Sequence, residues 1–368
     1  MCGEGEGRGY NGAGGFQLVP VRAVSILVFG VMLCSWAGAN PFIPNDPRVG
    51  ASWHIDKLGL TDAWGYSLGN SSVIAAVLDT GVMSNTADLQ GRLLPAIAPP
   101  GTPILDGTAV HHGTWVSSVL AMGVNDNIGG AGVGNFSILP VTVTNENGNN
   151  SSDVVADGIR LAADRGARVI NISLSTLSYG KLDAAAAYAK DRGALVFMAA
   201  GNTDGRIERP HFENLIFVSG TNRDDRRWDA DGNDSLVTNN SGSSWGPFVD
   251  LSAPADDILV ADPTFASGYG IGDGTSFAAP LAAGAAALAW SINPALSVDE
   301  VKQILFSTAV DLGTPGWDEF YGWGRVNIGA VASAATATVP EPAGSVFFGL
   351  PLSIFAVFCR RIRKREIY

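Results

Sequence analysis

Three side chains that together can generate a nucleophile lie in three separated segments of the chain: the carboxylate of Asp79, the imidazole of His112 and the hydroxyl of Ser276. A serine hydroxyl attacks a carbonyl carbon efficiently only when a base accepts its proton. The base in turn needs a carboxylate, which fixes its tautomer and stabilises the imidazolium that forms. If folding brings the three groups together, they indicate acyl transfer through a serine nucleophile.

The candidate nucleophile opens a long apolar run. Ser276 is followed by residues 277–290, which are almost wholly Ala, Leu and Gly and therefore predict a buried helix. Pro280 fits the start of such a helix, where its missing N–H costs little. The N–H groups at a helix N-terminus are unpaired, so we expect the N–H of Ser276 to be available to an oxyanion. The alternative interpretation is an ordinary serine cap on a core helix.

The other two candidates also stand at the ends of predicted elements. Asp79 directly follows residues 73–78, a continuous apolar run that is typical of a buried parallel strand. His112 follows a second histidine, His111, at the start of a helical stretch. Because open α/β sheets bind their ligands at the carboxyl ends of strands, the position of Asp79 favours a functional role.

The rest of the body alternates strands with helices. Residues 222–247 are polar and predict a loop. The alternation predicts one α/β domain, with a mainly parallel sheet covered by helices on both faces. The further strands are expected over 139–143, 167–174, 195–200 and 215–219, and the further helices over 56–65, 151–165, 184–192 and 297–306.

Composition excludes several classes of protein. Hydrophobic residues make up 46% of the 368 positions and charged residues only 16%, so the chain can bury a large core and is not disordered. A net charge of −12 argues against nucleic acid as a partner. The cysteines are Cys2, Cys34 and Cys359, all near the ends, so the body has neither a disulfide nor a thiol nucleophile.

The motifs around the three candidates resemble those of the subtilisin-like serine proteases, in particular the thermitase-like subtilases. Asp-Thr-Gly-Val follows a strand, His-Gly-Thr begins one helix and Gly-Thr-Ser-Phe-Ala-Ala-Pro begins another, in the family's order Asp, His, Ser. The resemblance covers residues 45–331 and implies a three-layer α/β fold with an Asp79, His112 and Ser276 triad. His112 takes the role of the base because it carries the Gly-Thr, with His111 as the alternative.

The resemblance also implies an oxyanion donor and a substrate groove. Asn202 follows Ala-Ala-Gly and would face the oxyanion together with the N–H of Ser276, each donor contributing on the order of 3 kcal/mol. An extended peptide would be held between two edges by main-chain hydrogen bonds. The implied groove residues are Ser173, Leu174 and Ser175 on one edge, Gly148 with Asn147 and Asn149 on the other, and Ala199, Ala200 and Gly201 as the wall of the first specificity pocket.

Calcium is the cofactor that the resemblance implies. Hard cations bind oxygen-rich, irregular loops, and a bound cation would stabilise a body that has no disulfide. The alternative interpretation is a solvated Asn/Gly turn. The implied ligands are the carboxylates of Asp46, Asp88 and Asp126 and the main-chain carbonyls of Val124, Ile128 and Gly130.

Both ends of the chain have the composition of targeting segments. Residues 1–39 combine an apolar stretch with Ala37-Gly38-Ala39 and predict a signal peptide, with an uncleaved anchor as the alternative. Residues 339–368 contain Pro-Glu-Pro, an apolar stretch and a basic cluster. They resemble the PEP-CTERM sorting signal, which implies transient anchoring by the C-terminal apolar helix and cleavage by an exosortase. The alternative there is a simple tail anchor.

We therefore expect a peptidase domain over residues 40–331, a short spacer over 332–338 and a sorting tail. The protein would be a monomer that is exported across the inner membrane and acts on peptide or protein substrates at the cell surface or outside the cell. The rival hypothesis is a non-catalytic surface or matrix protein that binds through the same scaffold. Esterase activity is a third possibility, although the groove strands favour peptides.

Overall fold

The computed structural model describes residues 39–175, 178–229 and 241–337. All of these residues belong to one of the two compact units into which the chain divides, Gly38–Tyr368. The predicted sorting tail lies outside the described residues, and so does the predicted signal peptide except for Ala39.

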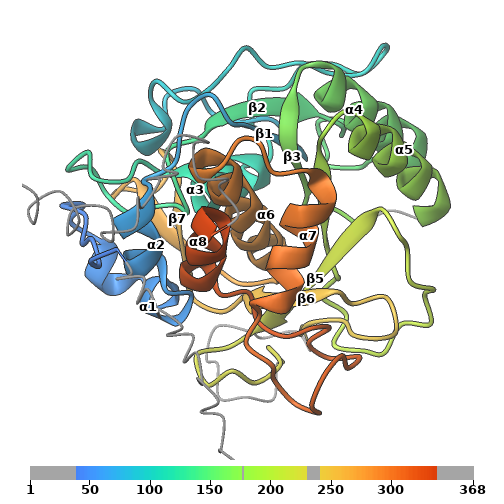
Figure 1. Ribbon diagram of the computed structural model, residues 1–368. Helices are drawn as coiled ribbons and strands as arrows, with labels where there is room; N and C mark the ends of the chain where they lie inside the picture. Colours follow the sequence, from blue (N-terminus) through green and yellow to red (C-terminus); the bar gives the residue numbers. More distant parts are fainter. Residues whose placement is uncertain (1–38, 176–177, 230–240, 338–368) are drawn as a thin grey trace, which may run out of the picture. The chain divides into compact units, whose positions relative to one another are not determined.

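A six-stranded parallel sheet forms the centre of this unit (Figure 1). Its order is β2-β1-β3-β4-β5-β6, and every neighbouring pair is parallel. The strands are buried along almost their whole length, which explains their uninterrupted apolar sequences. They are β1 (Ile74–Asp79), β2 (Ser137–Thr142), β3 (Ala167–Ile172), β4 (Leu195–Ala199), β5 (Leu215–Thr221) and β6 (Leu251–Pro254).

The chain order reverses within the sheet, because β2 lies on one side of β1 and β3 lies on the other. At such a switch point the connections leave in opposite directions and open a crevice at the carboxyl ends of the strands. Asp79 ends β1, and Ser173 follows the end of β3. The topology therefore places two of the predicted site residues at the switch point.

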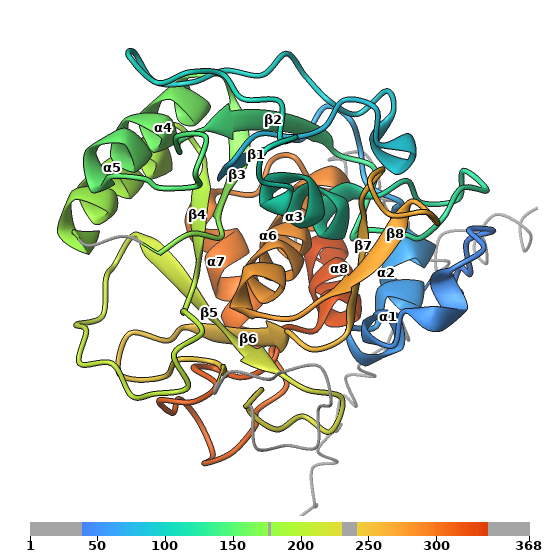
Figure 2. The ribbon, with the colours of Figure 1, turned by 180° about the vertical axis from the view of Figure 1, so that it is seen from behind.

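Helices cover both faces of the sheet, as the sequence predicted. The helices α4 (Ser152–Asp164) and α5 (Tyr179–Asp191) pack on one face, and Figure 2 shows them on the opposite side of the sheet from α3 (His112–Ala121) and α6 (Thr275–Ile292). Alternate residues of each strand enter the two cores, so that Val77 packs towards α6 and Leu78 packs towards α4. The three-layer α/β fold is confirmed.

The helix α6 is the centre of the larger core. Among the described residues it is the one helix long and apolar enough to cross a membrane, but 89% of that stretch is buried inside the protein. Its small residues are required by close packing, since a Cβ added to Gly284 would lie 2.6 Å from Val133. It is the predicted buried core helix.

Smaller elements complete the domain. The antiparallel hairpin of β7 (Ile258–Ala261) and β8 (Tyr269–Gly272) was not predicted from the sequence. The helix α7 (Val298–Ser307) begins at a capping box, with Ser297 as the N-cap and Glu300 returning a bond to it. The remaining elements are η1 (Val49–Ala51), α1 (His54–Lys57), α2 (Leu60–Tyr66), η2 (Ala87–Leu89) and α8 (Ile328–Ala337).

The predicted spacer over residues 332–338 is wrong as far as the structure describes it. Residues up to Ala337 belong to α8, and Ala332 and Ala335 are fully buried against the core that α6 organises. Small residues gave this run the composition of a linker. Alanine, however, has the highest helix propensity and a side chain small enough to pack closely, so the run folds as a helix. The domain extends at least to Ala337.

Candidate active site

Asp79 and His112 are in direct contact. The imidazole Nδ1 of His112 lies 2.9 Å from Oδ1 and 3.0 Å from Oδ2 of Asp79, whose carboxylate is fully buried. The N–H of Thr80 donates a further hydrogen bond of 2.8 Å to Oδ1. A buried carboxylate needs such donors to offset the loss of hydration, and here they also fix the ring of His112 with Nδ1 towards Asp79.

The electrostatics of this pair favour the protonated imidazole. Burial of His112 on its own lowers the pKa of the imidazole, but the negative charge of Asp79 and its hydrogen bond outweigh burial. The net effect raises the pKa of His112 above its ordinary value of 6.5. Asp79 therefore stabilises the imidazolium that forms when the ring of His112 accepts a proton, as a general base requires.

The motif residues next to this pair bring β1 and α3 together. The hydroxyl of Thr80 donates to the carbonyl of Val110 at 2.8 Å and accepts from the N–H of Gly113 at 3.0 Å. A Cβ at position 113 would lie 2.3 Å from the carbonyl oxygen of Gly81, so only glycine permits this close approach. The Thr-Gly and Gly-Thr of the two motifs thus join the acid to the base.

His111, the alternative base, is engaged elsewhere. Its Nδ1 lies 2.9 Å from Oδ2 of Asp262 and its Nε2 lies 3.2 Å from the carbonyl of Thr108. The indole of Trp115 donates to the same carboxylate oxygen of Asp262 at 2.6 Å. Both ring nitrogens of His111 are occupied, so His112 is the imidazole that contacts Asp79.

Ser276 lies in the first turn of α6 and exchanges two hydrogen bonds with Ser173. Its hydroxyl donates to the main-chain carbonyl of Ser173 at 3.2 Å, and the hydroxyl of Ser173 donates to the main-chain carbonyl of Ser276 at 2.8 Å. Among the described residues Ser276 makes no hydrogen bond to His112. The ring of Phe277 is nevertheless centred 6.5 Å from the imidazole of His112, so the first turn of α6 lies beside His112.

Pro280 explains the second of these bonds. The proline was expected at the start of the helix, but it is the sixth residue of α6 and therefore cannot donate to the carbonyl four residues earlier, that of Ser276. The hydroxyl of Ser173 fills this gap, and Asn171 donates to the same hydroxyl at 3.0 Å. The sequence analysis placed Ser173 on the groove edge and did not foresee this link.

Two N–H donors close to Ser276 in the fold have no acceptor among the described residues. The carbonyl oxygen Oδ1 of Asn202 accepts hydrogen bonds from the N–H and the hydroxyl of Thr275, at 3.0 and 2.7 Å, which fixes the side chain and leaves its NH₂ group without a partner among the described residues. The N–H of Ser276 also has no acceptor there. Gly274, with φ of 134°, permits this arrangement, because a Cβ at that position would lie 2.9 Å from Nδ2 of Asn202. The two donors match an oxyanion site.

The groove residues predicted from the resemblance follow adjacent strands. Ser173 and Leu174 come directly after β3, and Ala199 ends β4, which pairs with β3 in parallel. Ala200 and Gly201 continue from β4 towards Asn202. The structure therefore brings these residues to the same sheet edge as Asp79. Gly148 lies in a hairpin closed by the antiparallel bridge of residues 144 and 150.

The predicted calcium loop is folded around Asp46. The two carboxylate oxygens of Asp46 accept hydrogen bonds from the N–H groups of Asn125, Asp126 and Asn127, at 2.7, 2.9 and 3.0 Å. Burial raises the pKa of Asp46, and the neighbouring charge of Asp126 adds to this effect, although the loop N–H groups oppose it. The N-terminal segment is thus joined to the loop by its own hydrogen bonds.

The carboxylate of Asp88 has an oxygen that could bind a cation. Its Oδ2 accepts from the N–H of Gly130 at 3.1 Å, whereas its Oδ1 is buried and has no hydrogen-bond partner. Burial is the main cause that raises the pKa of Asp88 to about 6, and the charges of Asp126 and Asp46 raise it further. Three carboxylates within electrostatic reach and one unsatisfied buried oxygen are the donor chemistry that calcium prefers.

Other predicted ligands already have protein partners. Oδ1 of Asp126 accepts from the N–H of Ile128 at 3.0 Å, and Oδ2 pairs with Arg92 at 3.4 Å. The carbonyl of Val124 accepts from the side chain of Asn135 at 3.2 Å. The residues fit calcium in part, and the ligand set stays a prediction.

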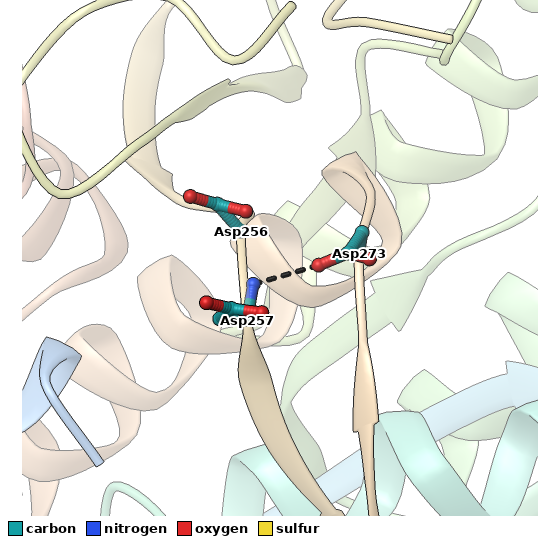
Figure 3. A group of neighbouring side chains, drawn as sticks. All are labelled: Asp256, Asp257 and Asp273. Carbon is teal, nitrogen blue, oxygen red and sulfur yellow. Dashed lines mark hydrogen bonds between the residues drawn. The ribbon is translucent and has the colours of Figure 1, made fainter. Parts of the chain in front are cut away.

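A different acidic group lies at the base of the β7–β8 hairpin (Figure 3). Asp256, Asp257 and Asp273 are the one group among the described residues whose three carboxylates each offer an oxygen within 4.8 Å of the others. The N–H of Asp257 donates to Asp273 at 2.7 Å, and the carboxylate of Asp257 pairs with Arg223 at 2.7 Å. These contacts join the two ends of the hairpin just before the loop that leads to Ser276. The sequence analysis did not predict this group.

Comparison with known proteins agrees with the motifs and the fold. Residues 70–324 match the family model described as the subtilase family. Thermitase from Thermoactinomyces vulgaris is 32% identical over 294 residues, which are 78% of this chain and 98% of thermitase. The halolysin-like extracellular serine protease Nep from Natrialba magadii is 32% identical over 310 residues, 81% of this chain. The chain spans only 54% of the length of Nep.

Solved structures show the same architecture. A protease from Pseudoalteromonas arctica PAMC 21717 superposes with a TM-score of 0.64 at 28% sequence identity, over 79% of this chain and 99% of that one. The mainly parallel sheet with helices on both faces is therefore the fold of this group of proteases.

Proposed function

We propose that this chain, which belongs to the subtilase family and is a serine-type endopeptidase, hydrolyses peptide bonds through an acyl-enzyme on Ser276. The observation that carries the proposal is the contact of His112 with the buried carboxylate of Asp79, beside the first turn of α6. Ser276 and two unpaired donors lie in that turn and next to it.

Acylation would begin when the hydroxyl of Ser276 leaves the carbonyl of Ser173 and turns to His112. Its oxygen attacks the peptide carbonyl carbon while its proton passes to Nε2 of His112, and Nδ1–H stays bonded to Asp79. The raised pKa of His112 supports this transfer. The N–H of Ser276 and the NH₂ of Asn202 would hold the oxyanion.

Collapse of the tetrahedral intermediate breaks the bond to the amine, which takes the proton from Nε2 of His112 and leaves. Water then attacks the acyl-enzyme with His112 as the base, and the carboxylic acid departs as the hydroxyl of Ser276 is restored. Each proton taken by His112 is thus returned within the same half-reaction. The roles of these residues are proposed from geometry and chemistry together.

The substrate would be an extended peptide. Ser173, Leu174 and Ser175 follow the central strand β3, and their main-chain groups at the sheet edge suit pairing with another strand. The small residues at 199–201 would form the wall of a roomy first pocket. These features favour a protein or peptide over a simple ester.

We also propose that calcium joins the N-terminal segment to the loop of residues 124–130. Asp46, Asp88 and Asp126 would hold it with carbonyls of the loop, and the buried Oδ1 of Asp88 supports this assignment. When bound, the ion supplies a structural cross-link, with no part in the acyl transfer.

Export is proposed from the sequence of both ends and from the extracellular relative Nep. Processing by an exosortase and transient anchoring remain predictions that rest on residues 339–368. Cell fractionation with antibodies against the body and against the last residues tests them, since processing would separate the two signals.

The decisive test of the activity is labelling by a fluorophosphonate, which traps an activated serine. We expect labelling of the full chain, abolished in Ser276→Ala and strongly reduced in His112→Ala, with circular dichroism showing that both variants fold. Absence of labelling in folded, calcium-loaded protein would instead favour the non-catalytic binding protein.

A further inference from the structure

The two edges of the proposed groove are tied together a short distance from the nucleophile. The side-chain amide of Asn150 donates a hydrogen bond to the main-chain carbonyl of Ser175, with Nδ2 and O 3.0 Å apart. Beyond this point the N–H of Ser178 donates to the hydroxyl of Ser152 at 2.9 Å. The side chain of Asn150 therefore bridges the two edges of the groove, and the hydrogen bond between Ser178 and Ser152 joins them farther along.

A third contact continues the same closure, because Lys181 pairs with Asp153 at 2.6 Å. Of the three contacts, that of Asn150 lies nearest to the site in sequence. It is also the one that uses a main-chain carbonyl of the predicted groove edge, so it is the contact that a substrate would have to displace.

Asn150 projects from a well-held hairpin rather than from a loose loop. Its main chain pairs with Thr144 in an antiparallel bridge. The side chain of Asn145 accepts from the N–H groups of Asn147 and Asn149, at 3.0 and 3.1 Å, and the N–H of Asn145 donates to the carbonyl of Asn149 at 2.9 Å. The hairpin therefore holds Asn150 opposite Ser175 as a fixed bridge.

The position of the bridge fixes which substrate residue it meets. Ser173 is bonded to Ser276 through both its hydroxyl and its carbonyl, so it lies next to the scissile bond. Along a β-strand, every second residue forms main-chain hydrogen bonds to the same neighbouring strand. If the carbonyl of Ser173 receives the first residue before the scissile bond, that of Ser175 receives the third.

A substrate strand would need a gap of a defined width between the two edges. Two strands that flank a third lie about 10 Å apart, twice the spacing of neighbouring strands. The side chain of Asn150, together with its hydrogen bond to Ser175, takes the place of the substrate strand in that gap. A bound peptide and the bridge exclude each other at this point.

We propose that Asn150 is a specificity-determining residue that limits main-chain pairing of the substrate to the two residues before the scissile bond. This inference rests on the proposed function of the groove. Substrates that extend farther must displace the Asn150 amide from Ser175, so they gain little from their added length. The enzyme would favour sites where only a short extended segment is accessible.

The test is a nested series of N-acetyl-oligoalanyl-phenylalanine p-nitroanilides with two to five residues. For the wild-type chain we expect kcat/KM to rise less than about 3-fold from two to four residues. In Asn150→Gly the groove is open, and two recovered main-chain hydrogen bonds at about 5-fold each predict a rise of roughly 10- to 25-fold. Asn150→Asp keeps the size, lacks the donor and is expected to behave like Asn150→Gly.

The matched control is Glu146→Gly, which also introduces a glycine on the same hairpin, at an exposed side chain without a hydrogen bond among the described residues. It is expected to keep the wild-type length dependence. The proposal for Asn150 would be overturned if kcat/KM of the wild type rose 10-fold or more with substrate length, or if kcat/KM of both Asn150 variants did not change with length. In either case hydrolysis of the two-residue substrate would still support the proposed function. Absence of hydrolysis and of fluorophosphonate labelling in the wild type would overturn both.

Discussion

Ser276 and Ser173 hold each other through two hydrogen bonds, each using the hydroxyl of one residue and the main-chain carbonyl of the other. The pair joins the first turn of α6 to the end of β3, two elements that are about a hundred residues apart in sequence. The proposed nucleophile is thereby positioned by a side chain that directly follows the central strand β3, as well as by its own helix.

Replacing Ser173 by alanine removes the donor that serves the carbonyl of Ser276. We expect a loss of about 1–2 kcal/mol in the free energy of unfolding, because a partly buried carbonyl is left unpaired, and a decrease of about 10-fold in kcat. Urea denaturation and steady-state kinetics measure the two effects. The double variant Ser173→Ala/Pro280→Ala restores a main-chain N–H to that carbonyl, so it is expected to recover stability. A double variant no more stable than Ser173→Ala would contradict the link to Pro280.

The pH profile should report the raised pKa of His112. The base must be neutral to accept a proton, so kcat/KM is expected to fall as the pH drops through a value above 6.5. In Asp79→Asn the charge that raises the pKa is gone while burial still lowers it, so the acid limb moves below 6.5. The same variant loses on the order of 10⁴ in kcat, which makes an activated ester the suitable substrate. An unmoved acid limb would contradict the assignment.

Stability gives an independent check of the same pair. Because the folded-state pKa of His112 is raised, its contribution to the free energy of unfolding is fully present below about 6.5 and is lost as the pH rises through the folded value. Chemical denaturation of the wild type and of Asp79→Asn between pH 5 and pH 9, on the catalytically inactive Ser276→Ala background, measures the difference. Parallel curves for the two proteins would argue against a stabilised imidazolium.

Asn202 is expected to act on kcat rather than on KM. Asn202→Asp keeps an oxygen for the N–H and the hydroxyl of Thr275 but removes the free NH₂ group, so kcat should fall by about 10²- to 10³-fold. Gly274→Ala reaches the same donor indirectly, since its Cβ would lie 2.9 Å from Nδ2 of Asn202. Steady-state kinetics that show a rise in KM alone would instead indicate a role in substrate binding.

Chelation should lower the melting temperature of the protein if calcium binds at Asp88. Asp88→Asn removes the carboxylate and is expected to abolish the response of the melting temperature to added calcium. Since the pKa of Asp88 is about 6, the stabilisation by calcium should fade below that pH, where the carboxyl is protonated and binds the ion poorly. Scanning calorimetry with and without calcium measures both effects.

The control for this experiment is Asp157→Asn, at an exposed residue of α4 whose carboxylate pairs with Arg160 on the surface. It is expected to keep the full calcium response. A response that survives in Asp88→Asn would move the cation elsewhere, with the group of Asp256, Asp257 and Asp273 as the next place to examine.

The sequence predicted what depends on local pattern. Continuous apolar runs identified the strands, and the Asp-Thr-Gly, His-Gly-Thr and Gly-Thr-Ser motifs identified the family, because each motif meets a local need such as the close approach of Gly113 to Gly81. Contacts between distant segments were not predictable in this way. The bond of His111 to Asp262 spans 151 residues, and no pattern within either segment indicates it.

Composition was misleading where one residue type serves two purposes. The alanine-rich residues after position 330 have the composition of a linker, yet they form α8 and bury Ala332 and Ala335 in the core around α6. Pro280 was likewise expected near the start of the helix, and the hydroxyl of Ser173, directly after β3, allows it as the sixth residue. In both cases tertiary packing decided between two readings that the sequence left open.

The dependence of the Ser276 carbonyl on Ser173 has a consequence for biosynthesis. A nascent chain has made β3 long before α6 leaves the ribosome, and α6 alone cannot hold its first turn in the reactive conformation because Pro280 withholds a donor. If Ser276 is the nucleophile, proteolytic competence is therefore expected only after α6 has docked against the finished sheet.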